Sequence, residues 1–160
     1  MNKITKEELA EWIECNQAHL YRFALSIVKN ETDAEDAVCE AIVKAFEHLN
    51  SLRDPNKLKS WIMTIVCNTA KTMCRKKGHE VIVAEVPDAE YEEDAYDYIL
   101  WDCVLKLSQP QRSAFVLHFY SGYNIKEISK ILKIQEGTVK SRIGRAKASL
   151  REMLKEGEYG

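Results

Sequence analysis

Polar and basic residues recur between positions 138 and 147 at a spacing that favours one face of a helix. Residues three to four positions apart share a helical face, so Thr138, Ser141 and Arg145 would all point outward. Hydroxyl, ammonium and guanidinium groups arranged in this way can bind phosphates and base edges in the major groove of duplex DNA. The candidate DNA-contacting residues are Thr138, Lys140, Ser141, Arg142, Arg145 and Lys147.

A second polar face lies on a helix that the sequence predicts from about residue 56 to residue 77. Its amide, hydroxyl and cationic side chains, with an indole ring nearby, could hold phosphates and unstacked bases. The simpler alternative is a helix whose cations stabilise the C-terminal dipole and whose tryptophan belongs to the core. The residues concerned are Trp61, Asn68, Lys71, Thr72 and Arg75.

An acidic face characterises the predicted helix over residues 33–49. Asp36 and Glu40 lie one turn apart, and Asp33 lies near the N-terminal end, where a carboxylate favours the helix dipole. One interpretation is a solvated surface, which is common on amphipathic helices. The other is a docking surface for a basic partner.

The element that must position the first set of residues is a helix-turn-helix over residues 122–147. Asn124 and Glu127 form a capping box at the start of its first helix. Apolar residues at helical spacing would pack its two helices together, namely Ile128, Leu132, Ile134, Val139 and Ile143.

Helical periodicity in the rest of the chain predicts an all-α protein of two small helical domains, residues 5–78 and 95–155, joined by an acidic linker over residues 79–94. We expect Phe115, Val116, Phe119 and Tyr120 to pack the helix that ends before Gly122. The expected helix boundaries are capping boxes at Thr5/Glu8, Thr32/Glu35 and Ser108/Gln111, a start at Asp54-Pro55, and stops at Gly78 and Gly122.

The formal net charge of −2 conceals an uneven distribution along the chain. Residues 1–78 carry a net charge of +1, residues 79–105 carry −9, and residues 106–160 carry +6. A basic C-terminal segment remains compatible with a nucleic-acid partner, because the acidic connector accounts for the overall sign.

The sequence offers little support for an enzyme, a metal site or a membrane span. It contains no Gly-rich phosphate loop, no H-E-x-x-H and no nucleophile motif, and its five cysteines form no C-x-x-C pair. We therefore expect no catalytic residue, metal or cofactor. The longest apolar runs are too short to cross a bilayer and no signal-peptide core is present, so we expect a cytoplasmic protein without direct membrane insertion.

The C-terminal half contains three motifs. Residues 107–112 read LSQPQR, residues 122–132 read GYNIKEISKIL, and residues 136–142 read EGTVKSR. They resemble the patterns L-x-P-x-x-R, G-[YL]-[ST]-x-x-E-I-A-x-x-L and E-G-T-V-[KR]-S-R of the sigma factors of bacterial RNA polymerase, of the small extracytoplasmic-function type in the sigma-70 family. Pro110 lies one position later than in the first pattern, and Ser129 stands where the second pattern has alanine. Lys133 stands in the turn where the family usually has glycine, and Gly144 stands where a bulkier residue is common.

The N-terminal half resembles the same family independently. Residues 33–41 read DAEDAVCEA, which is similar to the segment that family members dock on the polymerase clamp helices. Residues 61–70 read WIMTIVCNTA, which is similar to the helix that binds and melts the −10 element. The resemblance covers nearly the whole chain, in the family's order.

The resemblance implies a sigma factor that directs core RNA polymerase to promoters and stabilises strand opening. It implies −35 contacts by the helix-turn-helix and polymerase contacts by Asp33, Asp36 and Glu40, with the β′ clamp helices and the β flap as the polymerase partners. It also implies promoter DNA and a probable anti-sigma factor as partners, and nucleoid association in the holoenzyme. The −10 contacts would come from Asn50, Ser51, Arg53, Trp61, Asn68, Lys71, Thr72 and Arg75.

Two other functions are compatible with parts of the sequence. A stand-alone helix-turn-helix regulator would need a dimer surface or an effector domain, whereas residues 1–78 carry the docking and melting patterns. An adaptor that has lost DNA binding would not need the basic face of residues 138–147.

Overall fold

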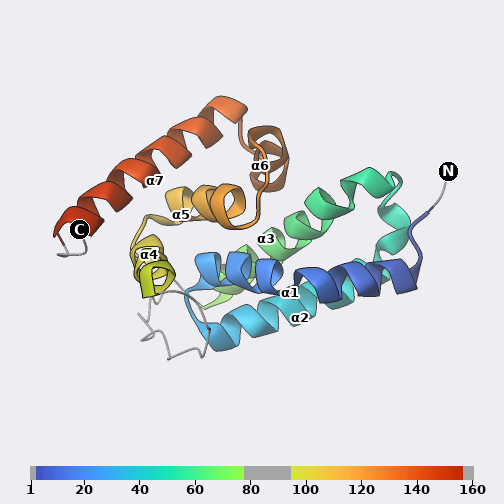
Figure 1. The fold of residues 1–160 in the computed structure, drawn as a ribbon. Coiled ribbons are helices and arrows are strands. Elements are labelled where there is room, and N and C mark those ends of the chain that lie inside the picture. Colours follow the sequence, from blue (N-terminus) through green and yellow to red (C-terminus); the bar gives the residue numbers. More distant parts are fainter. Residues whose placement is uncertain (1–2, 78–94, 157–160) are drawn as a thin grey trace.

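The computed structural model describes residues 3–77 and 95–156, and every regular element within these ranges is helical (Figure 1). The predicted all-α class is therefore confirmed. The elements are α1 (Lys6–Val28), α2 (Glu31–Glu47), the 3-10 turns η1 (Leu49–Ser51) and η2 (Pro55–Lys57), α3 (Leu58–Lys76), α4 (Ala95–Leu105), α5 (Gln109–Phe115), the π-helical turn η3 (Val116–Tyr120), α6 (Ile125–Leu132) and α7 (Glu136–Glu156).

Helices α1, α2 and α3 pack against one another and enclose an apolar core. The predicted capping box at the start of α1 is confirmed, because the Thr5 hydroxyl accepts from the Glu8 N–H at 3.1 Å and the Glu8 carboxylate accepts from the Thr5 N–H at 2.8 Å. Asp54 and Pro55 start η2 as expected, and α3 follows directly. The largest fully buried side chains of this unit are Leu9, Leu20, Phe23, Ile62 and Met63.

The predicted start of α2 at Thr32 is wrong. The helix begins at Glu31, and Asn30 is its N-cap, with its side-chain oxygen accepting from the Asp33 N–H at 2.9 Å. Lys29, in the left-handed conformation with φ of 57°, ends α1 and allows the chain to turn within two residues. Asn30 therefore caps the first turn of α2 before Thr32 is reached.

Helices α4, α5 and α7 enclose a second apolar cluster around Trp101, Val104, Val116 and Leu150. Phe119 does not join it as expected, because its side chain is 57% exposed and stacks on Phe115 at a centroid distance of 5.1 Å. The π-helical turn explains the difference, since the wider turn shifts the side-chain register that an α-helix would have kept.

The boundaries of α5 and η3 agree only partly with the expected ones. Ser108 precedes the helix, but its side chain makes no capping hydrogen bond, so the predicted Ser108/Gln111 capping box is wrong. Pro110 lies in the first turn, where its missing N–H is tolerated. Gly122 has a φ of 73° and ends the segment as predicted, whereas Gly78 lies outside the described residues.

The two halves of the chain share an apolar core. The cluster formed by α1, α2 and α3 continues into Leu117, Tyr123, Ile128 and Ile131, all of which are at most 3% exposed. Helix α6 lies against α3, and α5 lies against α1 (Figure 1). The surfaces of α3 and α6 are consequently set beside each other.

Candidate nucleic-acid interface

The turn between α6 and α7 is formed by a left-handed residue, as expected for a helix-turn-helix. Lys133 has φ and ψ of 58° and 47°, and its N–H donates to the Ser129 carbonyl oxygen. The Ser129 hydroxyl donates to the Ile134 carbonyl oxygen at 2.5 Å, which adds a side-chain hydrogen bond across the turn. The capping box of Asn124 and Glu127 at the start of α6 is confirmed.

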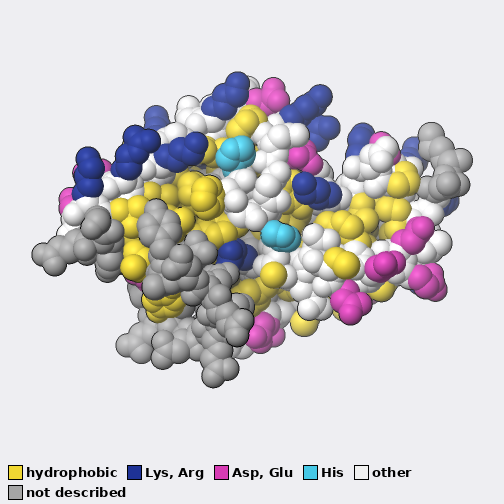
Figure 2. All heavy atoms as spheres, in the orientation of Figure 1, with side chains coloured by type: hydrophobic (Ala, Val, Ile, Leu, Met, Phe, Trp, Pro, Cys, Tyr) yellow, Lys and Arg dark blue, Asp and Glu magenta, His cyan; other side chains and the backbone are white. Residues whose placement is uncertain are grey.

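Helix α7 presents the first predicted DNA-binding set on the side away from its buried stripe. The side chains of Val139, Ile143, Ala146 and Leu150 are buried. Lysine and arginine side chains gather along the outer side of α7 (Figure 2). Within the predicted set, Lys140, Ser141, Arg145 and Lys147 are exposed and Thr138 and Arg142 are half-buried, so one helix brings all six residues to accessible positions.

The second predicted DNA-binding set is more dispersed. Asn68, Thr72 and Arg75 are exposed, whereas Trp61 and Lys71 are half-buried. Trp61 packs against the main apolar cluster, so its indole serves the core as well as the surface. Asn50, Ser51 and Arg53 are exposed in the loop before α3, where the Ser51 hydroxyl donates to the His48 carbonyl oxygen at 2.7 Å.

Different residues of this second set line different cavities. Ser51, Arg53 and Trp61 line a cavity of about 550 Å³ whose other wall is α6, with Lys126 and Lys130 among its residues. Lys71 and Arg75 line a different cavity of about 660 Å³ toward α5. Asn50, Asn68 and Thr72 line neither of these two cavities.

Tyr123 joins the beginning of α6 to the beginning of α3. Its hydroxyl donates to the Lys59 carbonyl oxygen at 3.5 Å, and the Lys59 ammonium lies 4.2 Å from the centre of the tyrosine ring. Burial, and then the Glu127 carboxylate, raise the pKa of the Tyr123 hydroxyl above its ordinary value. The tyrosine therefore stays neutral at physiological pH and holds α6 next to the Trp61 end of α3.

The predicted polymerase-docking residues occupy different environments on α2. Asp36 and Glu40 are exposed, and Glu40 pairs with Lys44 at 3.3 Å within the same helix. The Asp33 carboxylate is only 17% exposed and forms a salt bridge with Lys77 at the end of α3. The structure thus brings Asp36 and Glu40 to an open face and directs Asp33 toward α3.

Comparison with known proteins identifies the family. The family model for sigma-70 region 2 matches residues 12–80, and the model for sigma-70 region 4 matches residues 98–150. RNA polymerase sigma factor SigV of Bacillus subtilis is 32% identical over 94% of this chain and 93% of its own length. The chain belongs to the sigma-70 family. Its relatives include ECF RNA polymerase sigma factor SigM of Mycobacterium tuberculosis, 32% identical over 84% of this chain and 71% of its own length.

A solved sigma-factor structure agrees with this assignment. The sigma factor RpoE of Bartonella quintana, solved in complex with the anti-sigma factor NepR, superposes with a TM-score of 0.79 at 29% identity, covering 93% of this chain and 98% of that chain. CnrH, solved in complex with the cytosolic domain of CnrY, has a TM-score of 0.70 at 23% identity and supports the fold alone.

The protein is an extracytoplasmic-function sigma factor that directs RNA polymerase to promoters, with its region 2 and region 4 segments serving promoter recognition. The resemblance seen in the sequence motifs is thereby confirmed for both halves. The residue assignments within the two segments remain predictions.

The sequence motifs missed two features of this sigma factor. Val43 is 56% exposed on α2, on the same side as Asp36 and Glu40. Helical spacing could have revealed it, because residues 36, 40 and 43 recur at intervals of four and three. Arg112 is only 3% exposed and contacts backbone carbonyl groups between the two halves. No local sequence signal distinguishes such an arginine from an exposed one.

Three of the five cysteines of the sigma factor, Cys67, Cys74 and Cys103, are buried or half-buried. Burial raises the pKa of the thiols of Cys67, Cys74 and Cys103, which keeps them protonated and poorly nucleophilic at neutral pH. Within residues 3–77 and 95–156, no group of three or more His, Cys, Asp or Glu side chains could hold a metal ion. No helix in the same ranges is long and apolar enough to span a membrane.

Proposed function

We propose that the promoter-recognition task is divided between two domains, residues 5–78 for the polymerase and the −10 element and residues 95–155 for the −35 element. The observation that carries the proposal is the contrast between the exposed basic side of α7 and the aromatic, polar and acidic surfaces of α2 and α3. Duplex DNA favours the basic side of α7, an opened strand favours the aromatic and polar side of α3, and the acidic side of α2 suits a basic protein partner.

At the −35 element, α7 enters the major groove. Arg142 and Arg145 contact guanine edges or phosphates, and Lys140 and Lys147 contact phosphates. Thr138 and Ser141 hydrogen-bond to bases or backbone near the tip of the helix. The left-handed Lys133 sets the angle between α6 and α7, which keeps α6 out of the groove while α7 enters it.

At the −10 element, the loop before α3 and the polar side of α3 hold the opened strand. Extruding a base from the stack costs a few kcal/mol, so a shaped site must stabilise the opened state. The residues that provide it are Asn50, Ser51, Arg53, Trp61, Asn68, Lys71, Thr72 and Arg75. Because α6 forms one wall of the cavity at Ser51 and Trp61, α6 moves aside when a strand occupies this loop.

Contacts with the polymerase supply binding affinity that the two small DNA contacts alone would not provide. Asp36 and Glu40 dock on the β′ clamp helices, and Val43 adds an apolar contact between these carboxylates and the partner surface. Asp33 stabilises the start of the docking helix through Lys77. Region 4 contacts the β flap.

The protein itself carries out no catalysis and acts in the cytoplasm, associated with the nucleoid when it is part of the holoenzyme. An anti-sigma factor is its inhibitor, by analogy with the RpoE structure, which was solved with such a partner. No cofactor takes part in this function.

The direct test is transcription in vitro with purified core RNA polymerase and a promoter library. The chain should start transcription at a subset of promoters that share −35 and −10 sequences. Failure to start transcription at any promoter, with a sigma factor of known activity working in parallel, would contradict the proposal.

A further inference from the structure

We propose that the cavity of about 660 Å³ between the two halves is a binding site for an amphipathic organic anion, a small molecule with an apolar body and a carboxylate or phosphate group. Its occupation stabilises the closed packing of the halves. The regulatory part of this inference rests on the proposed function, whereas the binding site itself does not.

The cavity has the size and position of a small-molecule site. Volumes of 300–1,000 Å³ are typical of such sites, which occur preferentially between domains. One wall comes from the ends of α1 and α3, with Ile27, Val28 and Met73, and the other from the junction of α4 and α5, with Leu107. These apolar side chains provide a surface for a hydrocarbon or aromatic body.

Within the part of the chain that the structure describes, the charged groups around the cavity are almost all cationic. Five cations, Lys29, Lys71, Arg75, Lys77 and Arg112, line it together with one carboxylate, Asp33. Asp33 is already paired with Lys77. Among the residues that the structure describes, the other four cations form no salt bridge, so the site has a surplus of positive charge.

Arg112 is the strongest indication of an anionic ligand. Its Nε donates to the Ser26 carbonyl oxygen and its Nη1 donates to the Leu107 carbonyl oxygen at 2.7 Å, and both acceptors are uncharged. Burial lowers the pKa of the guanidinium to about 10. A buried cation without a counter-ion is unfavourable, and a bound anion would supply the missing charge.

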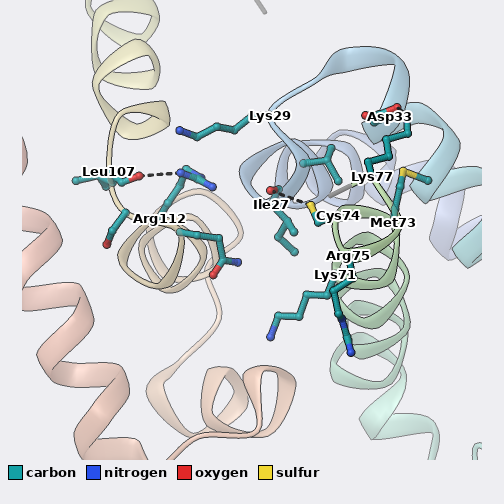
Figure 3. A pocket seen from close by; sticks show the side chains of 13 residues that line it. Ile27, Lys29, Asp33, Lys71, Met73, Cys74, Arg75, Lys77, Leu107 and Arg112 are labelled. Carbon is teal, nitrogen blue, oxygen red and sulfur yellow. Dashed lines mark hydrogen bonds and ion pairs between the residues drawn. The ribbon is translucent and has the colours of Figure 1, made fainter. Parts of the chain in front are cut away.

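Lys29 lies on the same side of the cavity as Arg112 (Figure 3). Burial, and then the charge of Arg112, lower the pKa of the Lys29 ammonium. Lys71 and Arg75 project from α3 on the other side (Figure 3). A ligand that fills the cavity would therefore lie between cations of both halves of the chain.

A ligand in this position would link the two halves. It would add to the contact between Arg112 and Ser26, which already joins α5 to α1. A molecule that binds only the closed packing stabilises it by mass action. Since α6 would stay beside the Trp61 end of α3, the bound form should open promoters less readily.

Calorimetric titration of the full chain tests the site, with decanoate as the amphipathic anion, decylamine as its cationic counterpart and inorganic phosphate as the anion without an apolar body. The variant Lys29→Gln removes one charge of the cavity, and Lys6→Gln removes a charge on the exposed start of α1. We expect decanoate to bind best, Lys29→Gln to weaken its binding about tenfold, and Lys6→Gln to leave its binding unchanged, because only the first variant removes a charged hydrogen-bond donor from the cavity.

Equal binding of decylamine and decanoate, or equal decanoate affinity of Lys29→Gln and the unaltered chain, would overturn the proposal. Absence of binding by every probe would also overturn it.

Transcription in vitro then tests the regulatory part. Decanoate should reduce initiation by the unaltered chain and have a weaker effect on Lys29→Gln, whose basal initiation should be normal. Decanoate binding without an effect on initiation would overturn the regulatory link while leaving the site in place. A chain that binds decanoate but never initiates would instead contradict the proposed function.

Discussion

The outer side of α7 and the polar side of α3 differ in how much of the protein surrounds them. Lys140, Ser141 and Arg145 are exposed on one regular helix, so this side is ready to contact duplex DNA. On α3, Trp61, Lys71 and Arg75 line two cavities, each of which has a wall from the C-terminal half, whereas Asn68 and Thr72 are exposed and line neither. The surface that reads a duplex is preformed, whereas the part of the α3 surface around Trp61 and Lys71 must first be uncovered.

The largest expected effect concerns the core that keeps α3 covered. Leu117 is fully buried in the apolar cluster that spans both halves, so Leu117→Ala should lower the free energy of unfolding by about 2–5 kcal/mol. Urea denaturation followed by circular dichroism measures the loss. Both halves should unfold in a single transition in the unaltered chain, and two separate transitions would show that the halves are independent.

A charge reversal on α2 tests the proposed polymerase-docking surface and alters neither of the two DNA-binding sides. Asp36→Arg should weaken binding to core polymerase by about tenfold or more, because like charges placed opposite each other cost several kcal/mol. Binding to a −35 duplex should be unchanged. Normal core affinity in a pull-down titration would mean that the docking side of α2 is misassigned.

Removal of one guanidinium from α7 tests the preformed side. Arg145→Ala should weaken binding to the −35 duplex by about 1–3 kcal/mol and relax the base preference at one position, since a bidentate contact to guanine contributes that much. Lys147→Ala should instead weaken binding to all DNA sequences alike and reduce the salt dependence of that binding. Electrophoretic shifts with a set of single-base variants distinguish the two patterns.

The smallest expected effect is a stabilisation of α7. Gly144 is an exposed residue within the helix, and a Cβ atom added there meets no atom within 4 Å. Gly144→Ala should therefore raise the free energy of unfolding by up to about 1 kcal/mol. A rise in melting temperature with unchanged −35 affinity would confirm that this side of α7 is already ordered before DNA binds. Loss of affinity would mean that Gly144 approaches the DNA closely.

The sequence predicted those features that depend on neighbouring residues. The capping boxes of α1 and α6 and the stop at Gly122 follow from residues within a few positions of one another. The predicted start of α2 at Thr32 was wrong because Asn30, two residues earlier, caps the helix instead. The outward turn of Phe119 depends on a local π-helical register that apolar periodicity does not reveal.

The packing between the halves could not be predicted, because it depends on residues far apart in the chain. The contact of Arg112 with Ser26 and that of Tyr123 with Lys59 join positions 86 and 64 residues apart. Helical periodicity identifies a buried stripe but does not show which partner covers it. The exposed and covered DNA-binding sides therefore looked equivalent in the sequence and differ only in three dimensions.

The division of labour between α7 and α3 is tested most directly by transcription from matched templates, one fully paired and one with a pre-opened −10 region. Arg145→Ala should lose activity on both templates, whereas Asn68→Ala should lose activity on the paired template and regain part of it on the opened one. Equal losses on both templates for the two variants would contradict the assignment of strand opening to α3.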